Sequence, residues 1–424
     1  MRIFARFKFN THHCNKMKWA LIVATRCIHI GIMVLLSLTL VLTMLVVVSS
    51  ASLVYDFALP QPFSGPDIFD PYRNVDTTLG WKRAALHTHS RVEGIFNECD
   101  FTPRQITDRY RELGYDVVHF SNHNEHTEHP TEGHVAIYEH GYNIAKLHMN
   151  VYGSDDVMSY DPIIPIFDFQ RQFKLELLAK DADLVQLNHP GRTKGLDKET
   201  LQRLGGYRVI ELSNIISRNQ EEWDWALSAG RYVFAVYTDD MHFLDCSYAV
   251  ARRSTMLNTP SESYEDVVAT LNDGAYYSLY TPDYGGGNWD IKRDMNPAVP
   301  RIRTIGESCG EIYVTFTEPA DSVCFTGQNQ RVLHTAYGCD SASYVMADED
   351  SYARITAYFA DGERIYTNAF ARYDAAKMDS PFDAEHYSVN VWLTILYNLA
   401  LLVIVTLLGV ALYKVLRRWE SFKN

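Results

Sequence analysis

The sequence predicts an α/β domain followed by a small β-sandwich, with a membrane-spanning helix on either side of the pair. Three observations predict this class. Two long stretches without charge lie at residues 30–54 and 391–413. Strand-like and helix-like patterns alternate between residues 81 and 285, which is typical of α/β folds. Short alternating strands with turn signals follow at residues 301–375, and these indicate a β-sandwich.

The two charge-free stretches are each long enough to cross a membrane. The first has 25 residues and the second has 23, whereas a spanning helix needs about 20. A cleaved signal peptide is the alternative for the first, because its basic flank and the small residues 49–52 suit one. Its apolar part exceeds the roughly 7–15 residues usual in signal peptides, which favours an uncleaved anchor.

Both chain ends are basic, and this predicts the orientation. Residues 1–29 carry six Lys or Arg residues and no acid, and residues 414–424 carry four against one acid. Cytoplasmic flanks of membrane spans are enriched in Lys and Arg. We therefore expect two cytoplasmic tails, and an extracytoplasmic segment of residues 55–390 at a cell membrane.

The segment between the spans is strongly acidic. It has 29 Lys and Arg residues against 51 Asp and Glu residues, a formal net charge of −22. Such a surface repels a nucleic-acid backbone, so no nucleic-acid partner is expected. Its five cysteines give no disulfide framework, but Cys309, Cys324 and Cys339 cluster in the sequence, and one pair among them could form a disulfide.

The elements follow in order along the chain. Two Gly- and Pro-rich stretches, residues 55–80 and 282–300, predict a linker before the α/β domain and a break after it. The clearest helix runs from Thr102, which can cap it, to Gly114, which ends it. A strand follows at residues 115–123. Alternation of this kind favours parallel strands.

Metal-ligand side chains stand at the ends of several predicted strands. These residues are, in chain order, His87 and His89, His123, His189, Glu211 and Asn214, and Asp240 and His242. A lone histidine there is usually an ordinary loop residue, but ten of the 16 histidines fall between His87 and His189. Residues two apart on a strand share a face, and the carboxyl ends of parallel strands meet at one face of an α/β barrel. Histidine and carboxylate bind Zn, Mn or Fe, so the pattern predicts a multi-metal site.

The order and spacing of these motifs resemble the polymerase and histidinol phosphatase (PHP) superfamily of metal-dependent phosphoesterases. The matching motifs are HTHS at 87–90, SNHN at 121–124, the run from Glu139 to His148, NHPGR at 188–192 and DMH at 240–242. The resemblance covers about residues 81–285. The strands that follow, to about residue 372, resemble the tail of the carbaryl-hydrolase-like branch. The resemblance implies a distorted (β/α)7 TIM-like barrel that holds two or three divalent ions.

The resemblance also implies a role for individual residues. The implied metal ligands are His87, His89, Glu98, His123, Glu139, His148, His189, Asp240 and His242. Among them Glu139, Asp240 and His189 are the implied catalytic residues, and Glu139 is the bridging carboxylate. Glu98 is matched by counting back from Thr102, with Glu93 and Asp100 as rivals. Arg192 is a candidate contact for a substrate oxyanion, and a surface ion pair is the alternative.

The sequence departs from the family pattern in two places. The usual S-D-G after the first motif is absent, and Asn122 stands where the family has an aspartate. The second change weakens the inference of full activity. Five histidines have no role in the resemblance and are expected to be solvent-exposed or behind the ligands: His119, His126, His129, His134 and His140.

These expectations describe a membrane-tethered hydrolase that uses metal-activated water on phosphate esters. One alternative is a carboxyl-ester, carbamate or amide hydrolase, because the same activated water can attack carbon. Another is a metal-binding sensory module without turnover, and a third is an adhesion protein with a relic barrel. The double tether suggests a substrate near the membrane, such as a lipid headgroup or an envelope polymer.

Overall fold

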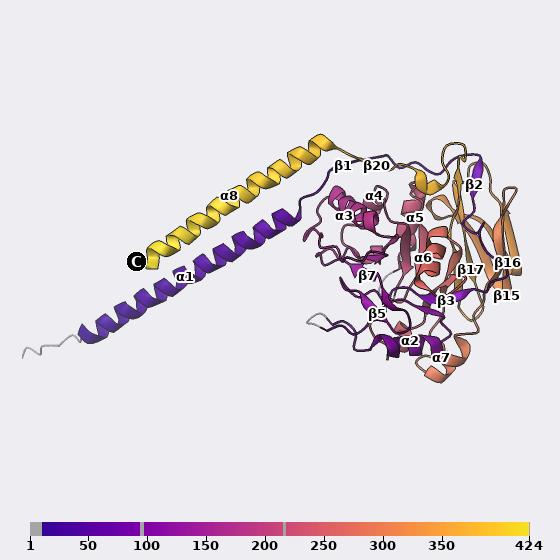
Figure 1. Cartoon of the computed structure of the whole chain (residues 1–424), viewed down its shortest axis with the longest axis horizontal. Coiled ribbons are helices and arrows are strands. Elements are labelled where there is room, and N and C mark those ends of the chain that lie inside the picture. The colour runs from indigo at the N-terminus through magenta and orange to yellow at the C-terminus, as the bar shows by residue number, and fades with distance from the viewer. Residues whose placement is uncertain (1–10, 94–96, 215–217, 424) are drawn as a thin grey trace, which may run out of the picture. The chain divides into compact units, whose positions relative to one another are not determined.

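The computed structural model describes residues 11–93, 97–214 and 218–423. The chain divides into two compact units. One comprises residues 1–52 and 391–424, and the other comprises residues 53–390. The first unit consists of two long helices, and the second is a mixed α/β unit with several sheets (Figure 1).

The two long helices are α1 (Thr11–Ser49) and α8 (Val391–Lys423), which lie side by side in Figure 1. Their apolar parts, Trp19–Ser49 and Val391–Trp419, reach mean hydropathies of 2.8 and 2.5. Both parts are long and apolar enough to span a membrane. This length and composition favour association with a membrane.

The first span ends earlier than the sequence predicts. The prediction was residues 30–54, but α1 ends at Ser49. The hydroxyl of Ser50 donates to the carbonyl of Val46 at 2.8 Å, and the chain then leaves the helix in a turn. Serine hydroxyls compete for backbone groups in this way, which favours helix ends over helix interiors.

A five-stranded sheet lies at the centre of the second unit, in the order β11-β10-β9-β8-β7. Its strands are β7 (Ile137–His140), β8 (Met149–Tyr152), β9 (Leu184–Leu187), β10 (Val209–Ser213) and β11 (Phe234–Tyr237). β9, β10 and β11 are parallel, as the sequence predicts, but β8 is antiparallel to both neighbours. The chain from β7 to β8 is too short for a crossover helix, so the two strands form a hairpin.

A larger, eleven-stranded sheet joins the α/β region to the β-rich region. It runs from β4 (Val117–Val118) through β3 (Lys82–Ala85), β12 (Arg253–Leu257) and β13 (Tyr276–Tyr280) to β18 (Arg364–Thr367). β13 and β18 pair antiparallel over four residues. The strands expected to form a small separate β-sandwich are therefore hydrogen-bonded to the α/β region.

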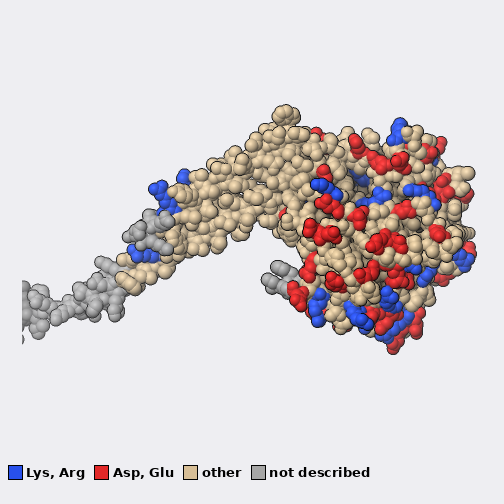
Figure 2. Space-filling view, viewed as in Figure 1, with Lys and Arg blue, Asp and Glu red and all other residues tan. Residues whose placement is uncertain are grey.

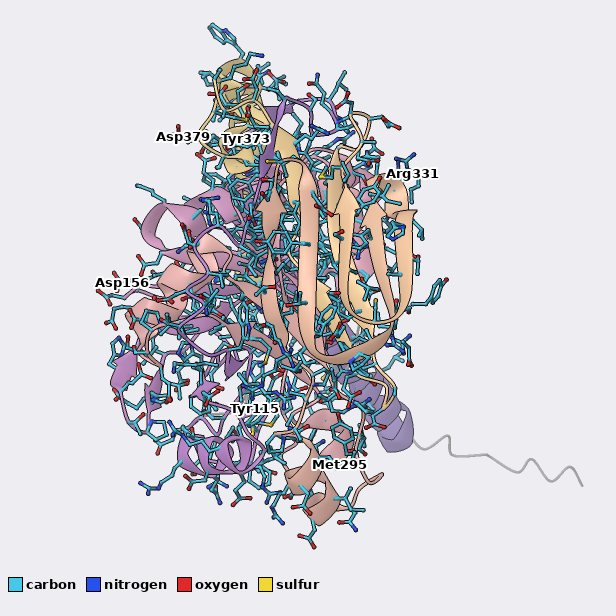
Figure 3. The ribbon with its side chains drawn as sticks, turned by 90° about the vertical axis from the view of Figure 1, so that its right-hand side faces the viewer. Tyr115, Asp156, Met295, Arg331, Tyr373 and Asp379 are labelled. Carbon is cyan, nitrogen blue, oxygen red and sulfur yellow. The ribbon has the colours of Figure 1, made fainter. Side chains whose placement is uncertain are left out.

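The remaining strands of the β-rich region are long and antiparallel, as Figure 3 shows. They are β14 (Ile302–Ser308), β15 (Glu311–Gly327), β16 (Arg331–Val345), β17 (Tyr352–Tyr358) and β19 (Phe370–Tyr373). The apolar faces of these strands enclose a second core, which includes Phe316, Phe325 and Ile355. Cys309, Cys324 and Cys339 are free thiols. The possible disulfide among them is not formed, because Cys324 lies opposite Thr335 on β16 and Cys339 opposite Ala320 on β15.

No closed barrel is found among the described residues, so the expected TIM-like barrel is not observed. Two isolated parallel bridges connect the two sheets, one between Thr88 and Met241 and one between His123 and Glu139. The regular ladders stop short of these positions; β4, for example, has only two residues. The backbone at these positions is irregular, whereas a closed barrel requires a continuous ladder.

The helices cover the sheets, and two of them confirm their sequence signals. In α2 (Pro103–Glu112), the Gln105 side chain accepts the N–H of Thr102 at 2.9 Å, and the Thr102 hydroxyl accepts the N–H of Gln105 in return. α6 (Tyr264–Asp273) ends at Gly274, whose φ of 90° is the left-handed conformation that glycine favours. The other helices are α3 (Asp168–Asp181), α4 (Lys198–Leu201), α5 (Gln220–Ser228) and α7 (Trp289–Met295).

The predicted linker before the α/β region contains two short strands. β1 (Tyr55–Phe57) pairs with β20 (Tyr387–Val389), and β2 (Asp67–Phe69) pairs with β19. The chain segments next to the two long helices are thus paired with each other. Acidic side chains are spread over the visible face of the second unit, in agreement with its composition (Figure 2).

Candidate metal centre

The structure brings all nine predicted ligand residues together in one cluster. They are His87, His89, Glu98, His123, Glu139, His148, His189, Asp240 and His242, and each is linked to another of them by a nitrogen-to-oxygen distance of 3.6 Å or less. They come from strand ends and loops of both sheets. Residues up to 155 positions apart in sequence therefore meet at one place, where the strands β3, β9 and β11 end.

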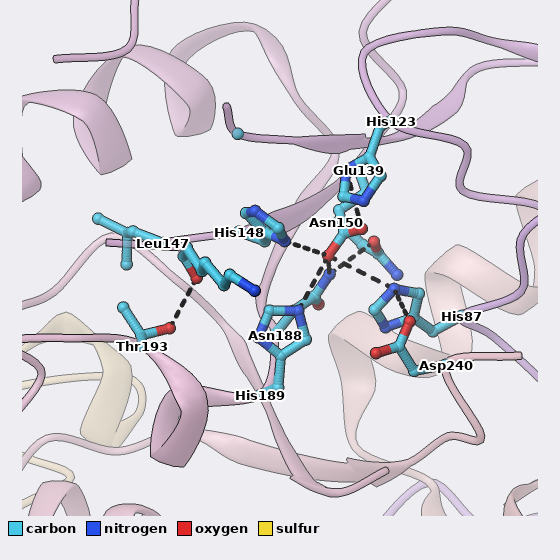
Figure 4. A network of polar contacts seen from close by, with 12 residues as sticks. His87, His123, Glu139, Leu147, His148, Asn150, Asn188, His189, Thr193 and Asp240 are labelled. Atoms are coloured by element: carbon cyan, nitrogen blue, oxygen red, sulfur yellow. Dashed lines mark hydrogen bonds and ion pairs between the residues drawn. The ribbon is translucent and has the colours of Figure 1, made fainter. Parts of the chain in front are cut away.

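Glu139 is at the middle of the cluster, as Figure 4 shows. Its two carboxylate oxygens lie 3.2–3.5 Å from nitrogens of five imidazoles: His87, His89, His123, His148 and His189. The carboxylate is almost completely buried. Histidine nitrogens thus lie close to both oxygens of this carboxylate, which could serve as a metal ligand.

His87, His89 and Asp240 form a nearly equilateral triangle of ligand atoms. Asp240 Oδ1 lies 3.2 Å from Nε2 of each histidine, and the two Nε2 atoms are 3.3 Å apart. Ligand atoms about 2.1 Å from one tetrahedral ion lie about 3.4 Å from each other. The observed triangle therefore fits one face of a metal coordination shell.

Glu98, rather than Glu93 or Asp100, reaches the cluster. Its Oε2 lies 3.0 Å from Nε2 of His123 and 3.4 Å from Nε2 of His242. These two hydrogen bonds hold the pKa of Glu98 well below its usual range.

Seven of the nine residues fall into three overlapping groups, each with ligand atoms within 4.8 Å of one another, and His189 and His242 belong to none of the groups. The groups are His87, His89 and Asp240; His89, Glu98 and His123; and His123, Glu139 and His148. Because His89 and His123 are each shared by two groups, the cluster has the donors for adjacent ions rather than for isolated ones. The donor set of nitrogen and carboxylate oxygen suits Zn²⁺, Mn²⁺ or Fe²⁺.

The charges of the buried cluster are strongly coupled. Burial opposes a charged His87, but Asp240 and Glu139 outweigh it and raise its pKa well above the usual value. Burial, helped by His242, lowers the pKa of His89 to about 4. Burial also opposes ionisation of Glu139, yet the surrounding imidazoles, His123 first among them, keep its pKa well below the usual value. A positive ion would replace the protons that these groups otherwise share.

Two of the ligand residues have left-handed backbone conformations. φ is 28° at His189 and 51° at Asp240, and each directly follows a buried run at a strand end. Positive φ is uncommon outside glycine and costs of the order of 1 kcal/mol or more. Such strain at two positions of one cluster indicates a functional constraint on where these side chains point.

Glu211 supports the cluster, although it was not in the predicted ligand set. Its Oε1 lies 3.1 Å from Nδ1 of His87, and its Oε2 accepts the backbone N–H of His189 at 2.7 Å. It also accepts a hydrogen bond from the hydroxyl of Thr238. A carboxylate on the far nitrogen fixes the ring orientation and tautomer of a metal-binding histidine. The sequence signal that could have identified Glu211 was its position near the end of a predicted strand, which the structure shows as β10.

Two asparagines that the sequence did not single out also contact the cluster. Asn188 donates to Glu139 Oε1 at 2.9 Å and to Asn150 Oδ1 at 2.8 Å. Both are fully buried. The Asn188 amide therefore orients the carboxylate of Glu139.

Asn122 is placed beside the ligands rather than among the three groups. Its Oδ1 accepts the N–H of Ser90 at 2.8 Å, and its Nδ2 donates to the hydroxyl of Thr127 at 2.5 Å. It therefore positions the residue that follows His89. An aspartate there would lack the amide donor that now bonds Thr127.

The five histidines without an implied role do not belong to the three groups of the described residues. The expectation for these residues was solvent exposure or a place behind the ligands. His134 is exposed, whereas His119, His129 and His140 are only 1%, 7% and 0% exposed, so for these three only the second alternative remains. His129 Nε2 lies 3.1 Å from the carbonyl of Val118, and His140 Nε2 lies 3.1 Å from that of Tyr160. These two side chains tie loops to the fold.

A cavity of about 660 Å³ opens beside the cluster. Eight of the nine ligand residues, all but His87, line it, and its lysine and arginine side chains are Lys146 and Arg192. The loops that carry these cations are joined, since the Thr193 hydroxyl donates to the carbonyl of Lys146 at 2.9 Å. The cavity thus combines a metal-type donor wall with a cationic side.

A search of protein-family models and a search of curated proteins gave no match to this chain. The case for the site rests on the residues and their geometry.

Proposed function

We propose that this chain is a membrane-tethered, metal-dependent hydrolase of phosphate esters. The observation that carries the proposal is the overlap of three ligand groups on shared histidines, next to a cavity that is large enough for a small organic ester. The motif order that resembles the PHP superfamily supports the same reaction class. The basic tails support an orientation with residues 55–390 outside the cytoplasm.

The residues that would hold the ions are those that the resemblance to the PHP superfamily implies, although the contacts group Glu98 with His89 and His123. His87, His89, Glu98, Glu139 and Asp240 would serve a first pair, His148 and His189 would complete its second ion, and His123 and His242 would hold a third. When bound, divalent ions supply a water nucleophile that is active near neutral pH and offset the charge of phosphoryl oxygens.

The chain's own residues then position the substrate and the ligands. Glu139, held by Asn188, presents one oxygen to each side of the cluster. Glu211 keeps Nε2 of His87 turned toward Asp240. Lys146 and Arg192 provide cationic groups in the cavity for phosphate oxygens that point away from the ligands.

An apolar rim supports a substrate that is presented at a lipid surface. Tyr142, Ile144 and Ile166 are 55%, 60% and 65% exposed. Tyr142 lines the cavity, and the N–H of Ile144 donates to the carbonyl of Ile163, which joins the loops that carry the rim. Exposed apolar groups beside a site often contact a membrane or an apolar ligand. We infer a lipid-linked or envelope-linked phosphate ester as the substrate class.

A metal-binding module without turnover is the second candidate. Asn122 favours it, because the family has an aspartate at this position and the amide is uncharged. Its hydrogen bonds to Ser90 and Thr127 show that it is built into the site as an amide donor.

The test uses the full chain in detergent, stripped of metal and reloaded with Mn²⁺ or Zn²⁺. Hydrolysis of a nitrophenyl phosphate monoester, the bis-nitrophenyl diester and nitrophenyl acetate is compared, with His87→Ala/Asp240→Ala as the blank. Turnover of a phosphate ester that vanishes in the blank supports the proposal, and the ratio of monoester to diester rates narrows the substrate. Turnover of acetate alone favours a carboxyl-ester or amide hydrolase. Bound metal without any turnover favours the sensory module.

A further inference from the structure

Two arginines near the amino ends of the central strands form no ion pair among the described residues. Arg231 is 4% exposed; its Nε donates to the carbonyl of Gln202 at 2.8 Å and its Nη2 to that of Ala58 at 3.1 Å. Arg208 donates to the carbonyl of Asn272 at 2.9 Å and 2.6 Å. Buried charges in proteins are normally paired with an opposite charge. The charges of Asp273 and Asp383 oppose the lowering of the Arg208 pKa by burial, but no carboxylate forms a direct ion pair with Arg208 or Arg231 among the described residues.

Burial shifts the pKa values of Arg231 and of the neighbouring His386. It lowers the pKa of Arg231 to about 10. It also lowers the pKa of the neighbouring His386 to about 4, and the charge of Arg231 adds to that shift. Such shifts indicate that Arg231 and His386 lack a nearby anion in the protein itself.

Both arginines line one cavity of about 240 Å³, together with His386. A second cavity of about 230 Å³ lies on the other side of Arg231 and shares His386 with the first. Asp183 is the one carboxylate on the wall of the first cavity, and its Oδ2 accepts the hydroxyl of Tyr264 at 3.2 Å. The guanidinium of Arg208 is stacked 3.9 Å from the ring of Phe382, which holds it at the cavity wall.

This cavity is separate from the metal centre. Its wall includes Leu184 and Val233, at or just before the amino ends of β9 and β11. The metal-type ligands His189 and Asp240 follow the carboxyl ends of the same strands. Parallel strands place these two sets of residues at opposite edges of the sheet.

We propose that a phosphate-type anion binds in this cavity between Arg208, Arg231 and His386. Guanidinium groups bind phosphate oxygens through paired, charge-assisted hydrogen bonds, and a volume of this size accommodates one phosphate group. The anion would place an opposite charge in direct contact with Arg231 and Arg208, of which Arg208 otherwise has only the more distant Asp273 and Asp383. The proposal is independent of the activity at the metal centre.

The anion could be a phospholipid headgroup or a soluble phosphate. His386 is five residues before α8, so at most about 18 Å of chain separates it from the apolar helix. This short connection makes a headgroup the source to test first. The alternative explanation is that Arg231 has only a structural role, in which its hydrogen bonds connect the segment at Ala58 to the loop at Gln202.

The experiment measures binding of inorganic phosphate to the full chain in detergent by isothermal titration calorimetry. Chelator is present throughout, so that phosphate cannot bind through metal at the other site. Arg208→Gln and Arg231→Gln are compared with Arg303→Gln, an exposed arginine of the β-rich region. Arg231→Lys keeps the charge and serves if Arg231→Gln does not fold.

Loss of one charge-assisted contact should weaken phosphate binding about tenfold or more in Arg208→Gln and Arg231→Gln. Arg303→Gln should bind as the unchanged chain does, and Arg231→Lys should lie between. Equal affinity in the four variants and the unchanged chain, or no phosphate binding at all, would overturn the proposal. Arg231 would then have a structural role only.

The source of the anion is decided in nanodiscs. Phosphate binding is compared in discs of phosphatidylcholine alone and in discs that also contain phosphatidylglycerol. If the anionic lipid abolishes phosphate binding in the unchanged chain, the headgroup is the occupant. If phosphate binds equally in both discs, the occupant is a soluble anion.

Discussion

Gly141 lies against the ring of His148. A Cβ atom on Gly141 would be 2.7 Å from Cδ2 of His148, and equally close to the carbonyl oxygen of Leu147. φ at Gly141 is 140°, which side chains rarely adopt. The hairpin from β7 to β8 therefore places His148 next to Glu139 at a position where residue 141 has no side chain.

Gly141→Ala should displace His148 and weaken metal binding. The added methyl group must push either the ring or the backbone away, and the Nδ1 of His148 then loses its place 3.2 Å from Glu139. We expect a loss of about tenfold or more in Zn²⁺ or Mn²⁺ affinity, or one fewer ion per chain by elemental analysis. Gly310→Ala is the control, because that glycine also has positive φ (86°) but has open space around it. Equal metal content in both variants would contradict this account.

Glu211→Gln should lower metal affinity without removing a ligand. The neutral amide no longer fixes the tautomer of His87, whose Nδ1 lies 3.1 Å from the carboxylate. Such partners usually account for about 10–100-fold in affinity. Competition with a chelator of known affinity measures the change, and Glu222→Gln, on α5, is a comparison at a carboxylate outside the cluster. An unchanged affinity would show that Glu211 only braces the backbone of His189.

The site could be predicted in part from strand ends and spacing. His87 and His89, and Asp240 and His242, are two residues apart and follow the buried runs of β3 and β11, although both pairs lie beyond the ends of these strands, where the rule that alternate residues share a face no longer applies. The cap at Thr102 is equally local, and α2 begins where that signal places it. These features need no knowledge of distant parts of the chain.

The rest depends on partners that sequence spacing does not reveal. The antiparallel β8 follows from a short hairpin, and Glu211 acquires its role only when β10 lies beside β9 and its carboxylate reaches His87. The left-handed conformations of His189 and Asp240 have no signal in the sequence spacing. The pairing of β13 with β18 likewise joins residues about 90 positions apart, so the expected separate sandwich could not be excluded beforehand.

Lys174→Met should destabilise the second unit strongly. Lys174 and Asp161 form a fully buried pair at 2.9 Å, and Asp161 also accepts the N–H groups of Tyr142 and Asn143. Removal of one partner leaves a buried charge, which costs about 3–5 kcal/mol in the free energy of unfolding. The double variant Lys174→Met/Asp161→Asn should lose less, because no unpaired charge remains. Guanidinium denaturation in detergent measures both, with the exposed Lys377→Met as the control; a single variant no less stable than the double one would contradict the argument.

Acid should destabilise the fold through His119. Burial, with a smaller effect of His129, lowers its pKa to about 3, and both ring nitrogens are without a hydrogen-bond partner among the described residues. The unfolded chain gains a proton near its usual pKa of about 6.5, whereas the folded chain does not, so stability is full above that pH and falls as the pH drops toward 3. At about pH 4.5 the loss from this residue is about 2 kcal/mol.

His119→Phe should remove that part of the pH dependence. The apolar ring has a similar shape and cannot gain a proton. Unfolding free energies are measured from about pH 8 to pH 4.5 with chelator present, and the variant should lose about 2 kcal/mol less than the unchanged chain. The exposed His334→Gln should follow the unchanged chain. Parallel curves for His119→Phe and the unchanged chain would mean that other groups cause the acid sensitivity.

The apolar rim should matter only for a substrate that is held in a lipid surface. Ile144→Ser/Ile166→Ser removes apolar area worth about 1.5–3 kcal/mol per side chain when it is buried against lipid. We expect about tenfold or more lower turnover of a long-chain phosphate ester in mixed micelles. Turnover of soluble nitrophenyl phosphate should not change, because neither side chain lines the cavity of the ligands. Val332→Ser/Val345→Ser, with 59% and 63% exposure on β16, is the matched control. If turnover of both substrates falls equally, the two isoleucines stabilise the loops rather than contact lipid. If turnover of neither substrate falls, the rim has no role in substrate access.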